Sequence, residues 1–158
     1  YLLRHGNAET WETLVHRRSD RVNDFCNKIA TPGGMVDRSD CIDEHSKVNI
    51  EHGFRCAMVR EVYEETGINL EGFPPDHIWN PEHSNSSTHR NYVIYFTASL
   101  PHAMPLPKCE WEMTRGGVDQ LGESVPGGFH AWVGLSELLS QSDLMSACRP
   151  VLEKTSFG

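Results

Sequence analysis

The sequence lacks a hydrophobic run long enough to cross a membrane. Its longest apolar stretch, Tyr92–Phe96, has the length of a β-strand, whereas a membrane-spanning helix needs roughly 18–20 apolar residues. The sequence also has no CxxC pair, no HxH or HExxH arrangement and no internal repeat. We therefore expect no membrane association, no zinc site of the common kinds and no repeat architecture.

Paired cysteines are also missing. The five cysteines are odd in number and scattered along the chain, at Cys26, Cys41, Cys56, Cys109 and Cys148. A disulfide framework would favour an even number at regular spacing. We expect free thiols and hence an intracellular, reducing compartment, either the cytoplasm or an organelle matrix.

Positive charge is scarce as well. Fourteen Lys and Arg residues stand against 22 Asp and Glu residues, so the formal net charge is −8. This balance disfavours the broad basic surface that binds nucleic acid or anionic membranes nonspecifically. If the ligand is a polyanion, a local feature must recruit it.

The length and hydrophobic content predict a single globular domain over residues 1–158. The chain has 158 residues, of which 38% are hydrophobic, and domains cluster near 100–150 residues. Since Tyr1 falls in what reads as the middle of a strand, we expect the chain to be trimmed at its N-terminus.

The patterns of apolar residues predict an α+β fold in layers. Strands are expected over 1–5, 13–17, 28–30, 77–80, 92–100 and 130–133. Helices are expected over 52–66, from 136 and over 144–154. Loops are expected over 35–49, 83–89 and 101–128. The helix over 52–66 has the clearest pattern, because Phe54, Met58 and Val62 form one apolar stripe and Gly67 supplies a C-terminal stop.

Three carboxylates crowd the end of this helix. Glu61, Glu64 and Glu65 are three or four positions apart and therefore lie close together on the helix. They repel one another, and the helix dipole disfavours anions at this end. A divalent cation such as Mg²⁺ or Mn²⁺ would reverse both effects. The alternative is a solvated acidic face on which Arg60 pairs with Glu64.

The surrounding residues complete a longer motif. A turn at Thr31-Pro32-Gly33-Gly34 precedes the segment Arg60-Glu61-Val62-Tyr63-Glu64-Glu65-Thr66-Gly67-Ile68. Together they resemble the Nudix box, whose pattern is Gly, five residues, Glu, seven residues, and Arg-Glu-apolar-x-Glu-Glu-x-Gly-apolar. The second half of the pattern matches at every specified position.

The resemblance implies a Nudix-type α/β/α sandwich with a mixed β-sheet. It also implies hydrolysis of a nucleoside diphosphate linked to another moiety, with Mg²⁺ or Mn²⁺ as cofactor. The substrate candidates are a nucleotide sugar, ADP-ribose, coenzyme A, a dinucleotide or the 5′ nucleotide end of an RNA. The oligomeric state is not implied.

The resemblance also assigns roles to residues. Glu64 and Glu65 would be the principal metal ligands, and Glu61 a further ligand or the base that polarises water. Arg60 would orient these groups, and the carbonyl of Gly33 would complete the metal shell. Gly34, Asp40 and Gly67 occupy structural positions of the box.

A fourth carboxylate in this family often comes from a late loop. Glu123 is the candidate because it precedes a strand that contains Trp132, which is similar to the Nudix arrangement. The alternative is an ordinary exposed loop acid, and Glu110 and Glu112 are rival positions.

The first half of the box carries an insertion. Arg60 follows Gly34 by 26 positions where the pattern has 14, so about 12 residues are added. Counting forward from Gly34 assigns the first box acid to Asp40. Counting back from Arg60 assigns it to the neighbourhood of Glu51. Either acid could support Arg60.

The sequence leaves three alternatives open. The chain could be a Nudix-fold binding module, or a subunit of an RNA-processing or ribosome-associated assembly, in which hydrolysis is lost or secondary. The carboxylates could instead hold Ca²⁺ or a structural metal ion. For the substrate, the run from Pro32 to Asp40 is similar to coenzyme A pyrophosphatases and Pro81 to ADP-ribose pyrophosphatases. The aromatic residues that could stack a base, or simply fill the core, are Trp79, Tyr92, Tyr95 and Trp111.

Overall fold

The computed structural model describes residues 1–6, 10–18, 28–73, 77–85, 90–101, 104, 130–145 and 148–155. The strands are β1 (Leu2–His5), β2 (Trp11–Arg17), β3 (Ile29–Ala30), β4 (His77–Asn85), β5 (Arg90–Ser99) and β6 (His130–Gly134). The helices are α1 (Ile50–Thr66), α3 (Leu135–Ser140) and α4 (Arg149–Thr155), with short 3₁₀ helices η1 (Arg38–Cys41) and η2 (Leu70–Gly72).

The strands form one mixed sheet of six strands. Strand β2 pairs antiparallel with β1, β3 and β6, and β4 pairs antiparallel with β5. Strands β1 and β5 are parallel, with Leu2 opposite Ala98. The first two predicted strands are confirmed, and they pair with each other antiparallel, with Leu3 opposite Thr13.

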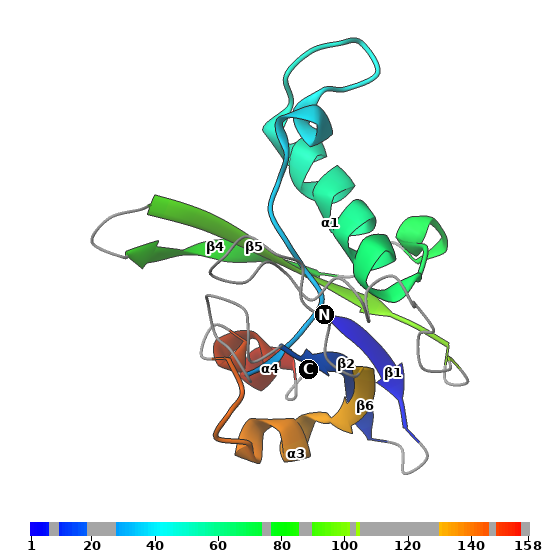
Figure 1. The fold of residues 1–158 in the computed structure, drawn as a ribbon, viewed down its shortest axis with the longest axis vertical. Coiled ribbons are helices and arrows are strands. Elements are labelled where there is room, and N and C mark those ends of the chain that lie inside the picture. Colours follow the sequence, from blue (N-terminus) through cyan, green and yellow to red (C-terminus); the bar gives the residue numbers. More distant parts are fainter. Residues whose placement is uncertain are drawn as a thin grey trace, which may run out of the picture.

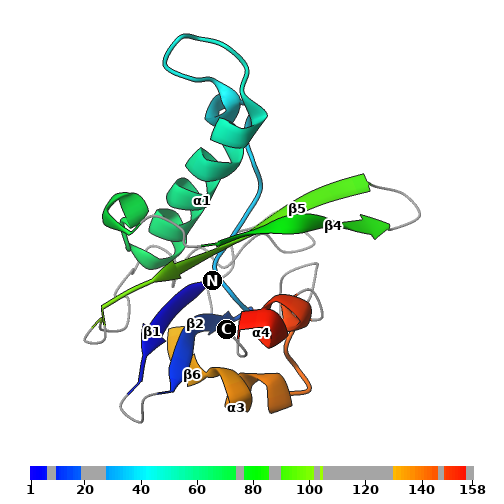
Figure 2. The same ribbon diagram turned by 180° about the vertical axis from the view of Figure 1, so that it is seen from behind.

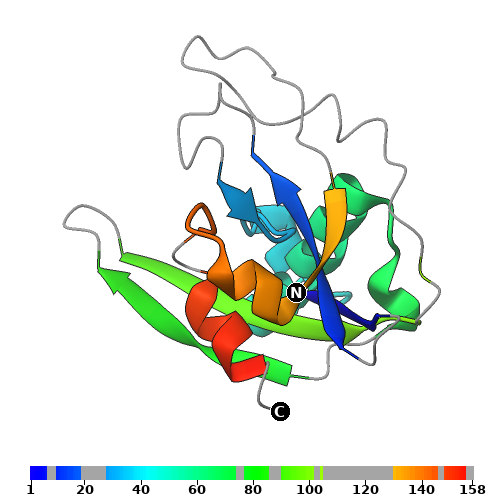
Figure 3. The ribbon, with the colours of Figure 1, turned by 90° about the horizontal axis from the view of Figure 1, so that it is seen from below.

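The helices cover the sheet on both faces. Helix α1 lies on one side of the sheet, and α3 and α4 lie on the other (Figures 1 and 2). From below, α3 and α4 cross in front of the strands (Figure 3). The expected α/β/α layers with a mixed sheet are therefore confirmed.

Consecutive apolar residues explain why both faces are covered. Neighbouring residues of a strand point to opposite faces, so the pairs Leu2-Leu3 and Leu14-Val15 each supply both cores. The core under α1 consists of Leu2, Leu14, Val62, Ile68, Leu70, Ala98 and Leu100. The core under α3 and α4 consists of Leu3, Val15, Leu135, Leu138, Leu144, Cys148 and Leu152.

Both ends of α1 are fixed by local residues. The Asn49 side chain accepts a hydrogen bond from the His52 amide, as an N-cap does. At the other end Gly67 has a φ of 71° and its amide donates to the Tyr63 carbonyl. A glycine adopts this left-handed conformation without the steric cost that a Cβ brings.

Three predicted elements are wrong in part. The expected loop over 35–49 contains η1 and a bridge between Ile42 and Val48, because local hydrogen bonds order a polar segment that has no period. The expected loop over 83–89 begins too early, since β4 continues to Asn85, opposite Arg90. The register of β4 shifts between Trp79 and Glu82, which accommodates a proline within a strand.

The third correction concerns the last helix, which was expected over 144–154 and begins at Arg149. Leu144 instead forms a β-bridge with Ile29, which lets its side chain pack in the core under α3 and α4. Pro150 then stands in the first helical turn, where the missing amide hydrogen costs nothing. None of the described helices is long and apolar enough to span a membrane. Most of the loop expected over 101–128 lies outside the described residues.

Candidate functional site

Arg60 is the centre of the polar cluster at the C-terminal half of α1. Its Nε and Nη2 atoms donate to the two carboxylate oxygens of Asp40, at 3.2 and 2.8 Å. Its Nη1 atom donates to Glu61 at 2.9 Å and to Glu64 at 3.5 Å. Nη2 also donates to the main-chain oxygen of Met35 at 2.9 Å. One guanidinium thus joins η1, the turn after β3 and two box carboxylates.

Asp40 is the acid that supports Arg60 in this structure. Its side chain is only 9% exposed, and its Oδ2 also accepts a hydrogen bond from the Asp37 amide. The hydrogen bonds from Arg60 hold the pKa of Asp40 below its usual value. The same bonds raise the pKa of Arg60, so that this pair stays charged. Glu51, the other sequence candidate, lies 3.8 Å from Arg55.

Glu61 packs directly against the backbone of the glycine turn. A Cβ atom placed on Gly34 would lie 2.1 Å from the Glu61 carboxyl carbon, so only a glycine allows this approach. The Glu61 side chain is 17% exposed. Burial raises the pKa of Glu61, while the hydrogen bond and the charge of Arg60 oppose that rise.

Glu65 connects α1 to the same turn through the neighbouring glycine. The Gly33 amide donates to Glu65 Oε2 at 2.8 Å. The turn after β3 therefore lies against two of the three box carboxylates, one through each glycine. Two sequence motifs that lie 26 positions apart, measured from Gly34 to Arg60, are adjacent in space.

Two histidines lie at the same end of the sheet. His16 on β2 and His130 on β6 face each other across the ladder, with ring centroids 5.8 Å apart. The His130 ring donates a hydrogen bond to the main chain of Glu65. Burial, with the charges of His130 and Arg18, lowers the pKa of His16 to about 4, and burial also lowers the pKa of His130. Both rings are therefore neutral near pH 7.

No sequence motif marked these histidines as part of the site. The alternation of side chains along a strand could have indicated the position of His16. Residues two apart point to the same face of β2, so His16 lies on the face of Leu14, which packs in the core under α1. Their pairing across β2 and β6 joins positions 114 residues apart, which is visible only in the folded chain.

The donor set fits a hard divalent cation. Glu61, Glu64 and Glu65 offer carboxylate oxygens alone, which are the ligands that Mg²⁺ and Mn²⁺ prefer. The guanidinium of Arg60 already lies between Glu61 and Glu64, so positive charge is stabilised at this position. Within the described ranges, no three His, Cys, Asp or Glu side chains are grouped closely enough to enclose a metal ion. Metal binding would therefore require Glu61, Glu64 and Glu65 to come closer together than they are here.

The remaining sequence candidates are the late-loop acids and the aromatic residues. Glu110, Glu112, Glu123 and Trp111 lie outside the described residues. Trp79 is part of β4, and Tyr92 and Tyr95 are part of β5. Trp132 on β6 packs against the core under α1, with the Arg4 guanidinium 4.4 Å from the centre of its ring.

Several solved structures share this fold. The sequence itself matches no model of a protein family and no curated protein. A Nudix hydrolase from Alicyclobacillus acidocaldarius aligns with a TM-score of 0.60 and 13% identity, over 99% of this chain and 88% of the other. The Ap4A hydrolase of C. elegans aligns with a TM-score of 0.58 and 18% identity, over 99% of this chain and 91% of the other.

A third similar structure is the Nudix domain of Shewanella oneidensis NrtR in complex with ADP-ribose. It aligns with a TM-score of 0.56 and 15% identity, over 99% of this chain and 84% of the other. The layers and the mixed sheet define an α/β/α sandwich. The chain has the Nudix hydrolase fold.

Proposed function

We propose that this protein is a divalent-metal-dependent pyrophosphohydrolase that cleaves a nucleoside diphosphate linked to another moiety. The observation that carries the proposal is the meeting of the glycine turn with the box carboxylates. Glu61 packs against Gly34, Glu65 accepts from Gly33, and Arg60 joins Glu61 and Glu64 to Asp40. The Ap4A hydrolase and the ADP-ribose complex among the similar structures support a nucleotide substrate.

The resemblance to the Nudix box suggests the role of each residue. Glu64 and Glu65 would be the principal ligands of Mg²⁺ or Mn²⁺, and the Gly33 carbonyl would complete the metal shell. Glu61 would be a further ligand or the base. Glu64 is the more open of the two box carboxylates bonded to Arg60, with 37% of its side chain exposed against 17% for Glu61. We also propose Glu123 as a late-loop ligand. The bound cation would activate a water molecule and neutralise the charge that develops on the leaving phosphate.

The chain's own groups would prepare the site for this chemistry. Glu61 has a raised pKa and is the candidate to take a proton from the attacking water, because a base works best when its pKa lies nearer the working pH. Arg60 would orient Glu61 and Glu64, and Asp40 would hold Arg60. The short link from Gly33 to Glu65 would keep the last box carboxylate beside the turn.

The test compares the wild type with Glu64→Gln on a panel of nucleotides. The panel contains ADP-ribose, a nucleotide sugar, coenzyme A, a dinucleoside polyphosphate and a 5′-triphosphorylated RNA, each assayed with Mg²⁺ and with Mn²⁺. We expect metal-dependent release of a nucleoside monophosphate or of phosphate product from the wild type. Glu64→Gln should lower that rate at least 100-fold, which corresponds to about 2.7 kcal/mol of transition-state stabilisation. Glu51→Gln, on the same helix, is the matched control.

A second candidate is a binding module, and the inserted segment favours it. Ile42, Val48 and Ile50, which lie between Asp40 and Glu51, expose 41%, 72% and 65% of their surface. Exposed apolar side chains can serve a partner, such as an RNA-processing or ribosome-associated assembly. The same assay decides between the two candidates. Equal product release by the wild type and Glu64→Gln would reject the hydrolase and leave the binding module.

We also propose that the protein works in a reducing compartment. The three described cysteines, Cys41, Cys56 and Cys148, are all free, as this compartment requires.

A further inference from the structure

Two thiols lie where η1 packs against α1, and the proposed function uses neither of them. A Cβ atom on Gly53 would collide with the Sγ atom of Cys41, so the Cys41 side chain rests directly on the helix backbone at this glycine. Gly53, Cys56 and Arg60 are three and four positions apart and therefore form one stripe of α1. The first and the last of them contact consecutive residues of η1, Cys41 and Asp40. Cys56 therefore lies on the stripe that faces η1, between these two contacts.

Cys56 has an imidazole beside it. Its Sγ atom lies 3.2 Å from Nε2 of His52, one helical turn earlier. Cys41 and Cys56 are both partly exposed, so a small reagent can reach them. An imidazole nitrogen accepts a proton, and the deprotonated thiolate is the form of cysteine that reacts with oxidants. The cluster thus supplies the groups that thiol oxidation needs, two sulfurs and a base.

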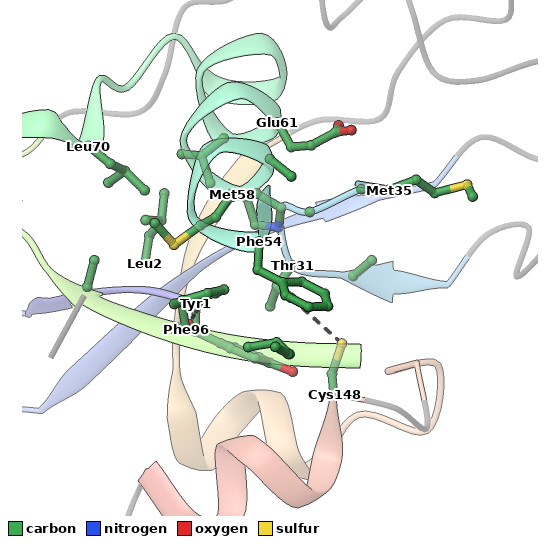
Figure 4. Close-up of a pocket in the computed structure, with 18 of the residues that line it drawn as sticks. Tyr1, Leu2, Thr31, Met35, Phe54, Met58, Glu61, Leu70, Phe96 and Cys148 are labelled. Carbon is green, nitrogen blue, oxygen red and sulfur yellow. Dashed lines mark hydrogen bonds between the residues drawn. The ribbon is translucent and has the colours of Figure 1, made fainter. Parts of the chain in front are cut away.

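The third described thiol has different surroundings. Cys148 is 5% exposed and lines a cavity of about 660 Å³ between α1 and the sheet, which extends to Glu61. Its Sγ atom lies 3.9 Å from the hydroxyl oxygen of Thr31 (Figure 4). A hydroxyl does not take up a proton near pH 7 as an imidazole does. Cys148 is therefore the internal comparison for the two thiols at η1.

The two thiols at η1 can be joined after a small movement. Cβ atoms three positions apart on a helix are about 5–6 Å apart, so the Cys41 sulfur, seated on Gly53, is about one helical turn from Cys56. Cysteines joined by a disulfide have Cβ atoms about 3.5–4.5 Å apart. Rotation of the side chains and a slide of η1 along α1 by a few ångströms would close this difference.

We propose that Cys56 and Cys41 are a site of thiol oxidation, at which a hydroperoxide causes a disulfide to join α1 to η1. His52 takes the proton of Cys56, and the thiolate sulfur attacks one oxygen of the hydroperoxide. The S–O bond forms as the O–O bond breaks, and the leaving oxygen receives the proton from His52. This step turns Cys56 into a sulfenic acid and releases an alcohol, or water when the oxidant is hydrogen peroxide.

Cys41 completes the reaction. Its sulfur attacks the sulfur of the sulfenic acid, the S–S bond forms, and the hydroxyl group leaves with the Cys41 proton as water. In total the two thiols lose two electrons and two protons, and the hydroperoxide is reduced to an alcohol and water. Exchange with a small thiol reverses the link. This oxidation is independent of the proposed function, because neither step involves a nucleotide, a metal ion or a box carboxylate.

The test is oxidation of the full chain by hydrogen peroxide in EDTA, without nucleotide. Remaining thiols are blocked with N-ethylmaleimide, and tryptic peptides are quantified by mass spectrometry. Trypsin cleaves after Lys47 and Arg55, so Cys41 and Cys56 fall on separate peptides that a disulfide would hold together. We expect this linked pair to be the main disulfide product and to disappear after reduction with dithiothreitol. It should form at least tenfold faster than Cys148 is oxidised.

Three substitutions assign the roles. In Cys41→Ser, dimedone should trap a sulfenic acid on Cys56, whereas in Cys56→Ser it should label Cys41 at least tenfold less. His52→Gln should slow the loss of the Cys56 thiol at least fivefold, because it removes the base. The hydrogen bond from the main-chain amide of His52 to Asn49 remains in this variant, so α1 keeps its N-cap. His45→Gln changes an exposed histidine of the inserted segment, and as the matched control it should react like the wild type.

The outcomes separate this inference from the proposed function. A main disulfide between any other pair of cysteines, equal oxidation of the three described thiols, or equal rates in His52→Gln and the wild type would each overturn the inference. If a variant does not fold, the linked peptides of the wild type still decide the question. Formation of the link in a protein that hydrolyses none of the nucleotide panel would support the oxidation site and reject the hydrolase. Hydrolysis without the link would do the opposite.

Discussion

Arg60 and Asp40 form a two-point contact across 20 positions of the chain, with donor to acceptor distances of 3.2 and 2.8 Å. This contact ties η1 to α1 and so closes the inserted segment onto the box helix. A guanidinium and a carboxylate match in this fork geometry, which fixes orientation as well as distance. The position of the box carboxylates therefore depends on an acid that lies outside α1.

The first prediction concerns the stability that this contact supplies. Asp40→Asn removes the charge that faces Arg60 in a setting where Asp40 is 9% exposed. We expect a loss of about 2 kcal/mol in the free energy of unfolding, measured by urea denaturation. Glu51→Gln, whose side chain is 81% exposed, should cost less than about 0.5 kcal/mol. Similar losses in both variants would contradict the assignment of Asp40 as the support of Arg60.

The second prediction concerns the glycine turn. In Gly34→Ala, the new Cβ would lie 2.1 Å from the carboxyl carbon of Glu61 and must displace that side chain. We expect Mn²⁺ affinity, measured by calorimetry, to fall at least tenfold. Gly72→Ala is the control, because its Cβ would meet nothing within 4 Å. Unchanged Mn²⁺ affinity in Gly34→Ala would remove Glu61 from the proposed ligand set.

The third prediction concerns metal and stability. A cation that binds the folded state alone stabilises it by about 2.7 kcal/mol at 100 times its dissociation constant. We expect Mn²⁺ to raise the Tm of the wild type in a calorimetric scan, and EDTA to reverse the rise. The shift should be much smaller in Glu64→Gln. A shift of the same size in this variant would argue against Glu64 as a ligand.

The fourth prediction concerns the loss of folding stability at acidic pH. The pKa of His16 is about 4 in the folded chain, against 6.5 for a free histidine, so between these values the unfolded state binds more protons. The stability that neutral His16 supplies is fully present above pH 6.5 and is lost as the pH falls toward 4. We expect a loss of about 3 kcal/mol over this window.

The measurement for this prediction is the free energy of unfolding from pH 7 to pH 4. His16→Gln should fall less steeply over that range than the wild type. His45→Gln, whose side chain is 73% exposed in the wild type, should follow the wild-type curve. Identical curves for His16→Gln and the wild type would show that His16 does not titrate in the way its burial implies.

The fifth prediction concerns the end of α1. Gly67 has a φ of 71°, a conformation that costs a residue with a Cβ about 1 kcal/mol. Gly67→Ala should therefore destabilise the protein by about that amount in urea denaturation. Gly67→Asn should cost less, because asparagine tolerates the left-handed region better than alanine.

Much of the architecture could be predicted from local patterns. The apolar stripe of Phe54, Met58 and Val62 and the stop at Gly67 located α1 to within two residues at its start. The prediction failed where a local pattern competes with pairing across the sheet. Leu144 reads as helical, yet it forms a bridge with Ile29 and packs in the core under α3 and α4.

For the site, the sequence by itself determined which groups are available. Glu61, Glu64 and Glu65 must crowd together because helical geometry alone puts them on neighbouring positions. Only the tertiary structure decided what they meet, because those partners lie in segments joined by long-range pairing. Asp40 rather than Glu51 faces Arg60, and Gly34 touches Glu61. His130 reaches Glu65 because β6 pairs with β2, and the cavity beside Glu61 exists because α1 packs across the sheet.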